Sequence, residues 1–416
     1  MRYSIFRLVR EAMSGHRGWT PLWRDATPKP NYDVVIVGGG GHGLATAYYL
    51  AAKHGITNVA VVEKNWIGSG NAGRNTTIIR SNYLLPGNEP FYEWSMQLWE
   101  GLERELNFNV MVSQKGVLNL CHTDGQRDAF ARRGNAMRLY GAGAELLDLE
   151  AVRRRLPYLD FDNARFPIQG GLLQPRGGTA RHDAVVWGYA RGASALGVDI
   201  IQGCEVTGFL REQGRIAGVE TTRGAIRSRK VGVAVAGNTS RVVALAGLRV
   251  PIESHILQAF VSEAVKPFLH GVVTFGAGHF YVSQSENGTL VFGGDIEGYN
   301  SYAQRGNLPM VEDVCEGGMA LMPMVGRLRV LRSWGGTVDM SMDGSPFIDR
   351  TAIEGLYLNA GWNYGGFKAT PASGWCFAHL LARDETHPLA AAFRLDRFAT
   401  GHAIDEKGQG ATPNLH

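Results

Sequence analysis

Cysteine is scarce in this chain, and the four cysteines that are present lie far apart. Cys121, Cys204, Cys315 and Cys376 form no C-x-x-C pair. The spacing therefore suggests neither a metal site nor a disulfide framework. Reduced thiols in a cytoplasmic compartment are the simplest interpretation.

Long hydrophobic runs and a strong surplus of charge are also missing. No apolar run reaches the roughly 18 residues that a membrane span requires. The N-terminus has no long apolar stretch and no small-residue cleavage site of a secretory leader. A net charge of +4 is too small to argue for nucleic acid as a partner. At 416 residues, with 44% hydrophobic and 19% charged residues, we expect a globular protein of two domains.

Glycine, by contrast, is abundant, with 55 residues, and its densest cluster follows a short apolar run. Residues 33–63 read DVVIVGGGGHGLATAYYLAAKHGITNVAVVE, in which Gly38, Gly40 and Gly43 fit G-x-G-x-x-G between a strand and a helix. The helix N-terminus then faces the phosphates of a ligand. Glu63 closes a second apolar run, where a carboxylate can accept protons from ribose hydroxyls. The pattern predicts a dinucleotide site.

The chain beyond Glu63 favours a flavin over a nicotinamide. It enters the glycine-rich loop WIGSGNAGRNTTIIRSNYL instead of continuing β-α-β, and several separated segments are needed to cover a flavin ring. Residues 91–104, 124–156 and 310–325 have helical patterns, and residues 250–298 read as an antiparallel sheet.

We therefore predict an α/β chain (α+β overall), with a Rossmann-like FAD-binding domain and an antiparallel-sheet substrate domain, both discontinuous. The expected divisions are an arm at 1–30, the FAD-binding domain at 31–110, 170–245 and 335–385, the substrate or cap domain at 111–169 and 246–334, and a C-terminal tail with little signal at 386–416.

The N-terminal arm has its own pattern. Tyr3, Phe6, Val9 and Met13 fall at helical spacing, with arginines between them. Because the segment precedes the nucleotide-binding strand, we expect it not to join that sheet. We interpret it as an arm that packs on the body or on a partner subunit; a membrane-surface helix is the alternative.

Several long strings resemble a known family. DVVIVGGGGHGLATAYYL with VVEK, GNAGRNTTIIRSNYL and GWNYGGFK resemble the FAD-dependent amine oxidases of the glycine oxidase and sarcosine oxidase group. ARHDAVVWGYAR, DIIQGCEVTGFL and SWGGTVDMSMDGSP resemble, more closely, the beta subunits of heterotetrameric sarcosine oxidases. The resemblance covers residues 31–405.

The resemblance implies which residues bind FAD. They lie in the phosphate loop, at the ribose end, in the loop that crosses the pyrophosphate, at the adenine and beside the isoalloxazine ring: Gly40, Gly41, His42, Glu63, Lys64, Asn71, Arg74, Thr76, Val206, Gly365, Gly366 and Lys368. From the residues alone, the glycine turn of GWNYGG would place N–H groups near an electron-rich flavin oxygen.

Arg80 and Lys368 are the predicted substrate clamp. A secondary amino acid needs its carboxylate neutralised, which an Arg does bidentately while a Lys adds a point charge. The resemblance implies oxidation of the N-methyl carbon of sarcosine, with hydride passing to FAD. The products are glycine with formaldehyde, or with a methylene group captured by tetrahydrofolate. No side-chain nucleophile is needed, because the protein's task is positioning.

His182 precedes an apparent helix whose positive end disfavours imidazolium. By itself such a residue is usually a cap or a surface histidine. The resemblance implies instead that His182 carries FMN covalently, between this chain and a large alpha subunit, with Arg181 pairing with the FMN phosphate or ring. Oxygen would then react at FMN and leave as H2O2. The further partners implied are gamma and delta subunits, and an alpha subunit that binds NAD.

Two departures from the monomeric relatives shape the prediction. Gly335 and Gly336 occupy the stretch where those relatives carry a Cys bound to FAD, so we expect non-covalent FAD. The run at 288–293 has no Lys of the kind that activates oxygen. Tyr281 and Asp295 are candidates to line the substrate pocket, without assigned roles.

Two other functions stay open on the sequence. One is an FAD-dependent dehydrogenase for another amino acid, such as a D-amino acid, proline or dimethylglycine. The other is a flavin-binding structural subunit without turnover, against which the presence of both Arg80 and Lys368 argues.

Overall fold

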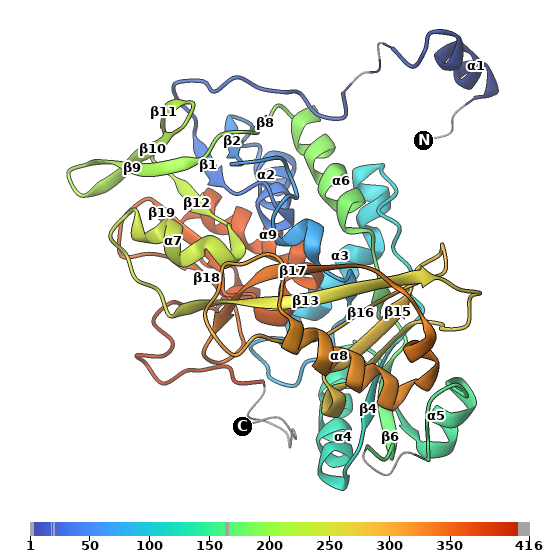
Figure 1. Ribbon diagram of the computed structural model, residues 1–416. Coiled ribbons are helices and arrows are strands. Elements are labelled where there is room, and N and C mark those ends of the chain that lie inside the picture. Colours follow the sequence, from blue (N-terminus) through green and yellow to red (C-terminus); the bar gives the residue numbers. More distant parts are fainter. Residues whose placement is uncertain (1–3, 18, 20, 163–165, 407–416) are drawn as a thin grey trace.

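The computed structural model describes residues 4–17, 19, 21–162 and 166–406, and two sheets dominate it (Figure 1). The first is a six-stranded sheet in the order β18-β19-β12-β1-β2-β8. All neighbouring pairs in it are parallel except β18 with β19. Its strands are β1 (Val34–Val37), β2 (Val59–Val62), β8 (Asp199–Ile201), β12 (Val231–Val233), β18 (Phe347–Arg350) and β19 (Leu356–Ala360).

The parallel strands bury both faces, which explains their continuous apolar runs. Val34 and Ile36 of β1 point into one core cluster, whereas Val35 and Val37 point into another. Helices form the first cluster: α2 (Gly41–His54), α3 (Glu89–Leu106), α6 (His182–Ala195) and α9 (Gly366–Arg383). The second cluster is covered by a three-stranded sheet and a short helix: β9 (Val206–Glu212), β10 (Arg215–Thr221), β11 (Gly224–Arg227) and α7 (Thr239–Ala244).

The second large sheet has eight strands in the order β17-β13-β16-β15-β14-β4-β6-β5. Only β14 and β4 pair in parallel; the other pairs are antiparallel. The strands are β4 (Val117–Cys121), β5 (Glu145–Asp148), β6 (Gly170–Gln174), β13 (Ile252–Ala264), β14 (Val272–Phe275), β15 (Phe280–Gln284), β16 (Thr289–Ile296) and β17 (Val330–Ser341). The helices beside it are α4 (Asp124–Leu139), α5 (Leu149–Arg155) and α8 (Leu308–Leu321). The predicted fold class is confirmed.

Short elements connect the two halves. The ribbon β3 (Ile78–Ile79) pairs with β7 (Gly178–Thr179). The 3-10 turns are η1 (Asn71–Arg74), η2 (Ala236–Asn238), η3 (Gly276–Gly278), η4 (Pro323–Arg327), η5 (Asn363–Gly365) and η6 (Pro388–Ala390). Of these, η1 packs against β17 of the eight-stranded sheet and against α6, and η5 packs against β17 and α9.

Some expectations were wrong in detail. The predicted helix at 124–156 is two helices separated by β5, because β5 pairs with β6. β6 lies in the eight-stranded sheet although 170–174 was assigned to the FAD-binding domain, and β17 crosses the expected boundary at 335. Both shifts arise because a strand's partners, which its own pattern does not reveal, decide its sheet.

Both ends of the chain also differ from expectation. Asp25 forms an isolated parallel bridge with Ile200 at the open edge of β8, so the N-terminal segment does reach the sheet. The C-terminal tail is firmly anchored: the Arg397 side chain is 1% exposed and hydrogen-bonds Asp343 through two nitrogens, at 2.7 Å each. This segment could not be assigned a structure from its residues, because a single buried Arg has no periodicity. Tyr3 lies outside the described residues.

Candidate active site and flavin-binding elements

The glycine turn between β1 and α2 has the geometry of a phosphate cradle. Gly38 has φ +111°, and a Cβ there would lie 2.3 Å from the carbonyl oxygen of Ala234. A Cβ on Gly43 would lie 2.0 Å from the carbonyl oxygen of Gly38. A Cβ on Gly40, the N-cap of α2, would meet no described atom within 4 Å. Gly38 and Gly43 are therefore required for packing, while the space above Gly40 fits a pyrophosphate at a helix N-terminus.

Glu63 directly follows β2 and lies beside this turn. Its carboxylate accepts hydrogen bonds from the backbone N–H of Gly39, at 2.9 Å, and of Asn65, at 3.0 Å. The carboxylate is therefore oriented before any ligand binds, at the place where a dinucleotide ribose is expected. The neighbouring Lys64 is exposed.

Gly41 and His42 begin α2. The ring of His42 faces inward: it stacks on Trp362 with centroids 4.6 Å apart, and its Nδ1 lies 2.5 Å from Oγ of Ser373. Burial lowers its pKa to about 3, so the ring is neutral. Its side chain thus links α2 to α9, which leaves the backbone amide as the group available for a phosphate.

Hydrogen bonds tie the loop after Glu63 to β17 and β15 of the eight-stranded sheet. The Asn71 amide donates to the carbonyl of Thr337 at 2.5 Å, and the hydroxyl of Thr76 donates to that of Tyr281 at 3.3 Å. The Arg74 guanidinium donates to the Gly70 carbonyl at 3.1 Å and to Gln304 at 3.0 Å. The Arg74 guanidinium therefore holds the loop in place through these hydrogen bonds.

The remaining predicted flavin contacts lie at strand and helix starts. Val206 begins β9 and is almost fully buried. Gly365 ends η5 and Gly366 begins α9. A Cβ on Gly336 would lie 3.2 Å from Oδ1 of Asn71, so this glycine of β17 lies close to the loop after Glu63.

Arg80 and Lys368 converge on one aromatic ring. The Arg80 guanidinium carbon lies 5.9 Å and the Lys368 Nζ 6.0 Å from the ring centre of Tyr83. Lys368 is 4% exposed, and its ammonium donates to the carbonyl of Tyr364 at 2.8 Å. Burial, reinforced by the nearby Arg80 charge, holds the pKa of Lys368 well below its usual range. Two basic side chains from distant segments thus lie beside the same ring, an arrangement that favours binding of one carboxylate.

Tyr83 and Tyr92 complete this arrangement and were missed from the sequence. Their rings stack at 3.8 Å with an interplanar angle of 11°. A Cβ on Gly365 would lie 2.1 Å from the Tyr92 hydroxyl oxygen and 3.3 Å from that of Tyr83, so both phenols reach the start of α9. The only available signal was the position of Tyr83 three residues after Arg80, which carries no information without the loop's conformation.

Glu406 was also missed. Its carboxylate accepts hydrogen bonds from the backbone N–H groups of Leu84, at 3.1 Å, and Leu85, at 2.8 Å, and lies 3.9 Å from the Arg133 guanidinium. The C-terminal tail therefore fastens the loop that directly follows Arg80 and Tyr83.

His182 is the first residue of α6. Its Nδ1 is buried and has no hydrogen-bond partner within the described part of the chain, while the residue as a whole is partly exposed. Burial lowers its pKa; Asp183 raises it and Arg181 lowers it. Arg181 forms a two-pronged pair with Asp183, at 2.9 and 3.1 Å. The ring is therefore neutral near pH 7, with an unused buried nitrogen.

Tyr281, predicted as a candidate to line the substrate pocket, contacts Thr76 of the loop after Glu63. Burial raises its pKa to about 12, so the phenol is protonated when it accepts from Thr76. The side chain of Asp295 lies outside the described part of the structure. Among the described residues, no group of three or more His, Cys, Asp or Glu side chains is placed to hold a metal. None of the described helices is both long enough and apolar enough to span a bilayer.

Comparisons with known proteins agree with this geometry. Residues 33–380 match the family described as FAD dependent oxidoreductase. The chain is 73% identical to the sarcosine oxidase subunit beta of Rhizobium meliloti (strain 1021) over 416 residues, which is 100% of both chains. It is 51% identical to the subunit beta of an Arthrobacter species over 391 residues, which is 94% of this chain and 96% of the relative.

Solved structures give the same fold. The L-proline dehydrogenase of P. horikoshii matches with a TM-score of 0.84 and 28% identity, over 90% of this chain and 99% of the other. The glycine oxidase of Geobacillus kaustophilus matches with a TM-score of 0.79 and 23% identity, over 89% and 99%.

Proposed function

The chain belongs to the FAD dependent oxidoreductase family, in the group of the sarcosine oxidase beta subunits, and on that premise we propose that it catalyses the oxidative demethylation of sarcosine. The observation that carries the proposal is the convergence of Arg80 and Lys368 on Tyr83, beside the start of α9. A small amino acid has one carboxylate for this pair of cations, and its amine then extends toward Gly365 and Gly366.

The residues of the chain bind and orient, and the cofactor supplies the chemistry. When bound, FAD would supply the acceptor for a hydride from the N-methyl carbon. The substrate would become an iminium as its C–H bond breaks and the nitrogen lone pair forms a C=N bond, and water would convert it to glycine and formaldehyde; tetrahydrofolate would be the alternative acceptor of the methylene group. Arg80 and Lys368 fix the carboxylate, and the Tyr83–Tyr92 stack keeps water out of the space between them.

FAD is proposed to be non-covalent, held by the cradle at Gly38, Gly40 and Gly43. The inward-facing Glu63 is proposed to hold its ribose, and Val206 its adenine. Gly41, His42, Lys64, Asn71, Arg74 and Thr76 are proposed to line the rest, with backbone amides more important than side chains at His42 and Arg74.

His182 is proposed to attach a second flavin, FMN, through a ring nitrogen. The neutral ring with an unpartnered Nδ1 supports a nucleophilic role, and Arg181 is proposed to turn from Asp183 toward the FMN. FMN held there would supply the reaction with oxygen, which would give H2O2.

The assembly is proposed to contain alpha, gamma and delta subunits, with the alpha subunit binding NAD and covering the FMN. We propose a cytoplasmic location, which the unpaired state of all four cysteines supports.

Anaerobic reduction of the purified flavoprotein tests the substrate. Sarcosine should bleach the FAD absorbance, whereas D-amino acids, L-proline and dimethylglycine at the same concentration should do so much more slowly. Faster reduction by one of these would instead support an amino-acid dehydrogenase, a function that the similarity to L-proline dehydrogenase keeps in view. Absence of reduction by all of them would leave a structural flavin-binding subunit.

Replacement of Arg80 tests the clamp. We expect Arg80→Ala to raise the apparent KM for sarcosine by about tenfold to a hundredfold, because a charge-assisted interaction is lost. Arg80→Lys should recover part of the loss. Bound FAD, measured by its absorbance, should be unchanged in both variants; an unchanged KM would remove Arg80 from the clamp.

A further inference from the structure

Helix α1 (Ile5–Met13) stands away from the rest of the chain (Figure 1). None of its residues is buried, and Phe6 and Met13 are 83% and 85% exposed. Ile5, Phe6, Val9 and Met13 share one side at helical spacing, and Arg7 lies on the other. A nine-residue helix is marginal in water without tertiary contacts, so this apolar side needs a cover. Within the described part of the chain no residue of α1 is buried, so the body does not cover the apolar side of this helix.

The segment that follows α1 is firmly attached to the sheet edge. Asp199 of β8 pairs with Lys29 at 2.8 Å and with Arg24, and it accepts from the Tyr32 hydroxyl at 3.0 Å. The backbone N–H of Arg24 also donates to Oγ of Ser194 on α6, at 2.9 Å. The arm therefore has a fixed root on α6 and β8.

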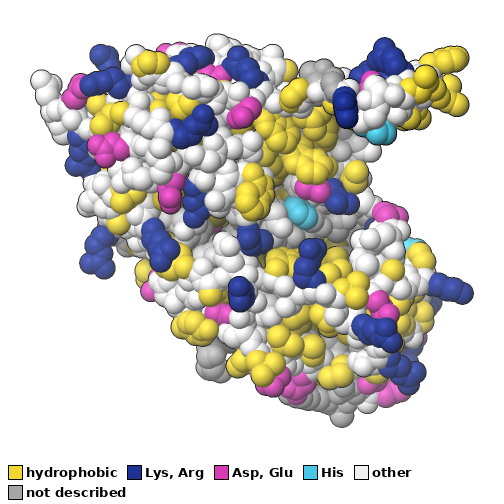
Figure 2. Space-filling model, turned by 45° about the horizontal axis from the view of Figure 1, so that its top comes forward, with side chains coloured by type: hydrophobic (Ala, Val, Ile, Leu, Met, Phe, Trp, Pro, Cys, Tyr) yellow, Lys and Arg dark blue, Asp and Glu magenta, His cyan; other side chains and the backbone are white. Residues whose placement is uncertain are grey.

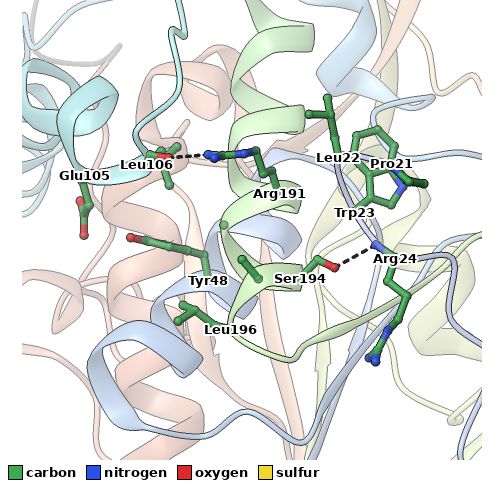
Figure 3. Close-up of a pocket in the computed structure, with 12 residues that line it drawn as sticks. Pro21, Leu22, Trp23, Arg24, Tyr48, Glu105, Leu106, Arg191, Ser194 and Leu196 are labelled. Carbon is green, nitrogen blue, oxygen red and sulfur yellow. Dashed lines mark hydrogen bonds between the residues drawn. The ribbon is translucent and has the colours of Figure 1, made fainter. Parts of the chain in front are cut away.

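A pocket of about 460 Å³ lies at this root (Figure 3). Leu22 and Trp23 line it on the side of the arm, and Tyr48 and Leu196 line it from α2 and the end of α6. Arg191 closes one end by donating to the carbonyl of Leu106 at 3.1 Å. Arg24 and Glu105 line it as well, so the pocket combines apolar walls with charged ones.

Exposed apolar side chains continue from the pocket toward the other end of α6. Leu22 and Leu196 at the root, Trp187 in mid-helix, and Trp66 and Met111 farther along are all exposed. Figure 2 shows hydrophobic side chains gathered in the hollowed face beside the arm. Because α6 begins at His182, the arm and this surface flank the same helix.

The comparisons indicate what covers the arm. The family match begins at residue 33, so residues 1–32 lie outside the domain shared with the whole family. They are included, however, in the full-length match to a protein named as a subunit. Among the described residues 4–17 there are three arginines and one glutamate, so the arm is basic. A partner subunit with an apolar groove and an acidic rim complements it in both shape and charge.

We propose that α1 and the exposed apolar surface of α6 form one docking surface, on which α1 is held in an apolar, acid-rimmed groove of the partner subunit that covers His182. This proposal rests on one part of the proposed function, namely that the chain works in a multi-subunit complex. The arm clamps the partner from one side of α6 and thereby fixes it over His182 at the other end.

Variants of the arm test the proposal in the intact complex. The chain, tagged at its C-terminus, is expressed in its own host, and its stoichiometric companions are identified in the wild-type preparation. We expect the double variant Phe6→Glu with Met13→Glu to lower the recovery of the companion subunit by at least about tenfold, as loss of an apolar anchor does. Arg7→Glu with Arg10→Glu should weaken recovery most at low salt, because charge complementarity is screened by salt. Met342→Glu, which is 82% exposed on the turn after β17, is the matched control and should have no effect.

FAD content and anaerobic FAD reduction by sarcosine are measured on the same samples. Both should be unchanged in the arm variants, because α1 touches no residue of the flavin site. Full recovery of the companion with both double variants would overturn the docking proposal. Self-association of the purified chain and its binding to anionic phospholipid vesicles are measured as well. If the arm variants lower the recovery of the companion only because the arm mediates one of these two interactions, the docking proposal is also overturned. Failure of sarcosine to reduce FAD in the wild type would instead overturn the proposed function and leave the docking result standing.

Discussion

Lys368 gives the substrate site a pH dependence with a definite sign. Burial and Arg80 lower its pKa, so the free enzyme loses the ammonium charge at a lower pH than an exposed lysine does. A bound carboxylate favours the charged form, and binding therefore takes up a proton. We expect the affinity of the enzyme for a small carboxylate inhibitor that has no amine to fall as the pH rises through the lowered pKa of Lys368. Inhibition constants measured across this range check the prediction.

Lys368→Met is the control for that assignment. It should weaken inhibitor binding at low pH and remove most of the pH dependence. Persistence of the same pH profile in the variant would assign the titration to another group, such as Tyr83, whose pKa burial raises.

Substitutions at Gly40 and Gly43, in the turn between β1 and α2, should distinguish effects on FAD binding from effects on folding. Gly43→Ala places a Cβ 2.0 Å from a backbone oxygen, so the variant should lower the melting temperature and lose FAD. Gly40→Ala meets no described atom within 4 Å, and its φ of −83° suits any residue. We expect Gly40→Ala to leave the melting temperature of the apoprotein unchanged while weakening FAD binding. Thermal denaturation of apoprotein and titration with FAD check both; equal melting losses in the two variants would contradict the distinction.

At the scale of elements, the C-terminal tail contributes stability through one buried ion pair. Burial alone would raise the pKa of Asp343, but hydrogen bonds from Arg397 and from the backbone prevail and lower it. Arg397→Met leaves the carboxylate buried without its partner, which costs about 3–5 kcal/mol of unfolding free energy. Urea denaturation checks this figure. Arg394→Met, which removes the exposed pair with Asp396, should give no measurable change.

The ion pair of Asp343 with Arg397 also determines how the stability of the protein changes at acid pH. Because the folded-state pKa of Asp343 is lowered, its contribution to stability is present above the ordinary carboxyl pKa and is lost as pH falls through the lowered one. The wild type should therefore lose stability more steeply below about pH 4 than Arg397→Met does.

The elements that could be predicted are those whose pattern is local. The run DVVIVGGGGHG predicts β1, the turn and α2, since periodicity and glycine spacing depend only on neighbours in sequence. The breaks between α4, β5 and α5 could not be predicted, because β5 is defined by pairing with β6. Likewise Arg80 and Lys368 could be singled out by charge and by resemblance, whereas Tyr83 becomes informative only when the fold brings it between them.

On the proposed function, the site of substrate oxidation and the site where electrons leave lie apart in the molecule. The clamp lies where β3, α3 and α9 meet, while His182 lies at the start of α6, on the face that the arm and the apolar surface flank. Within β16 no lysine lies near the clamp, so nothing on that strand resembles the oxygen-activating group of the monomeric relatives. A chain with this layout should oxidise sarcosine and yet depend on His182 for its reaction with oxygen.

His182→Ala in the intact complex tests this separation. Sarcosine should reduce FAD at the wild-type rate under anaerobic conditions, because Arg80, Lys368 and the glycine cradle are untouched. Production of H2O2 in air should fall by about a hundredfold or more, since the second flavin is lost, and acid precipitation should release all flavin from the variant but not from the wild type. His402→Ala, at an exposed histidine of the tail, should behave as wild type in all three measurements. Acid-stable flavin and full H2O2 production in His182→Ala would place the exit of electrons elsewhere, and His182 would then be only the first residue of α6.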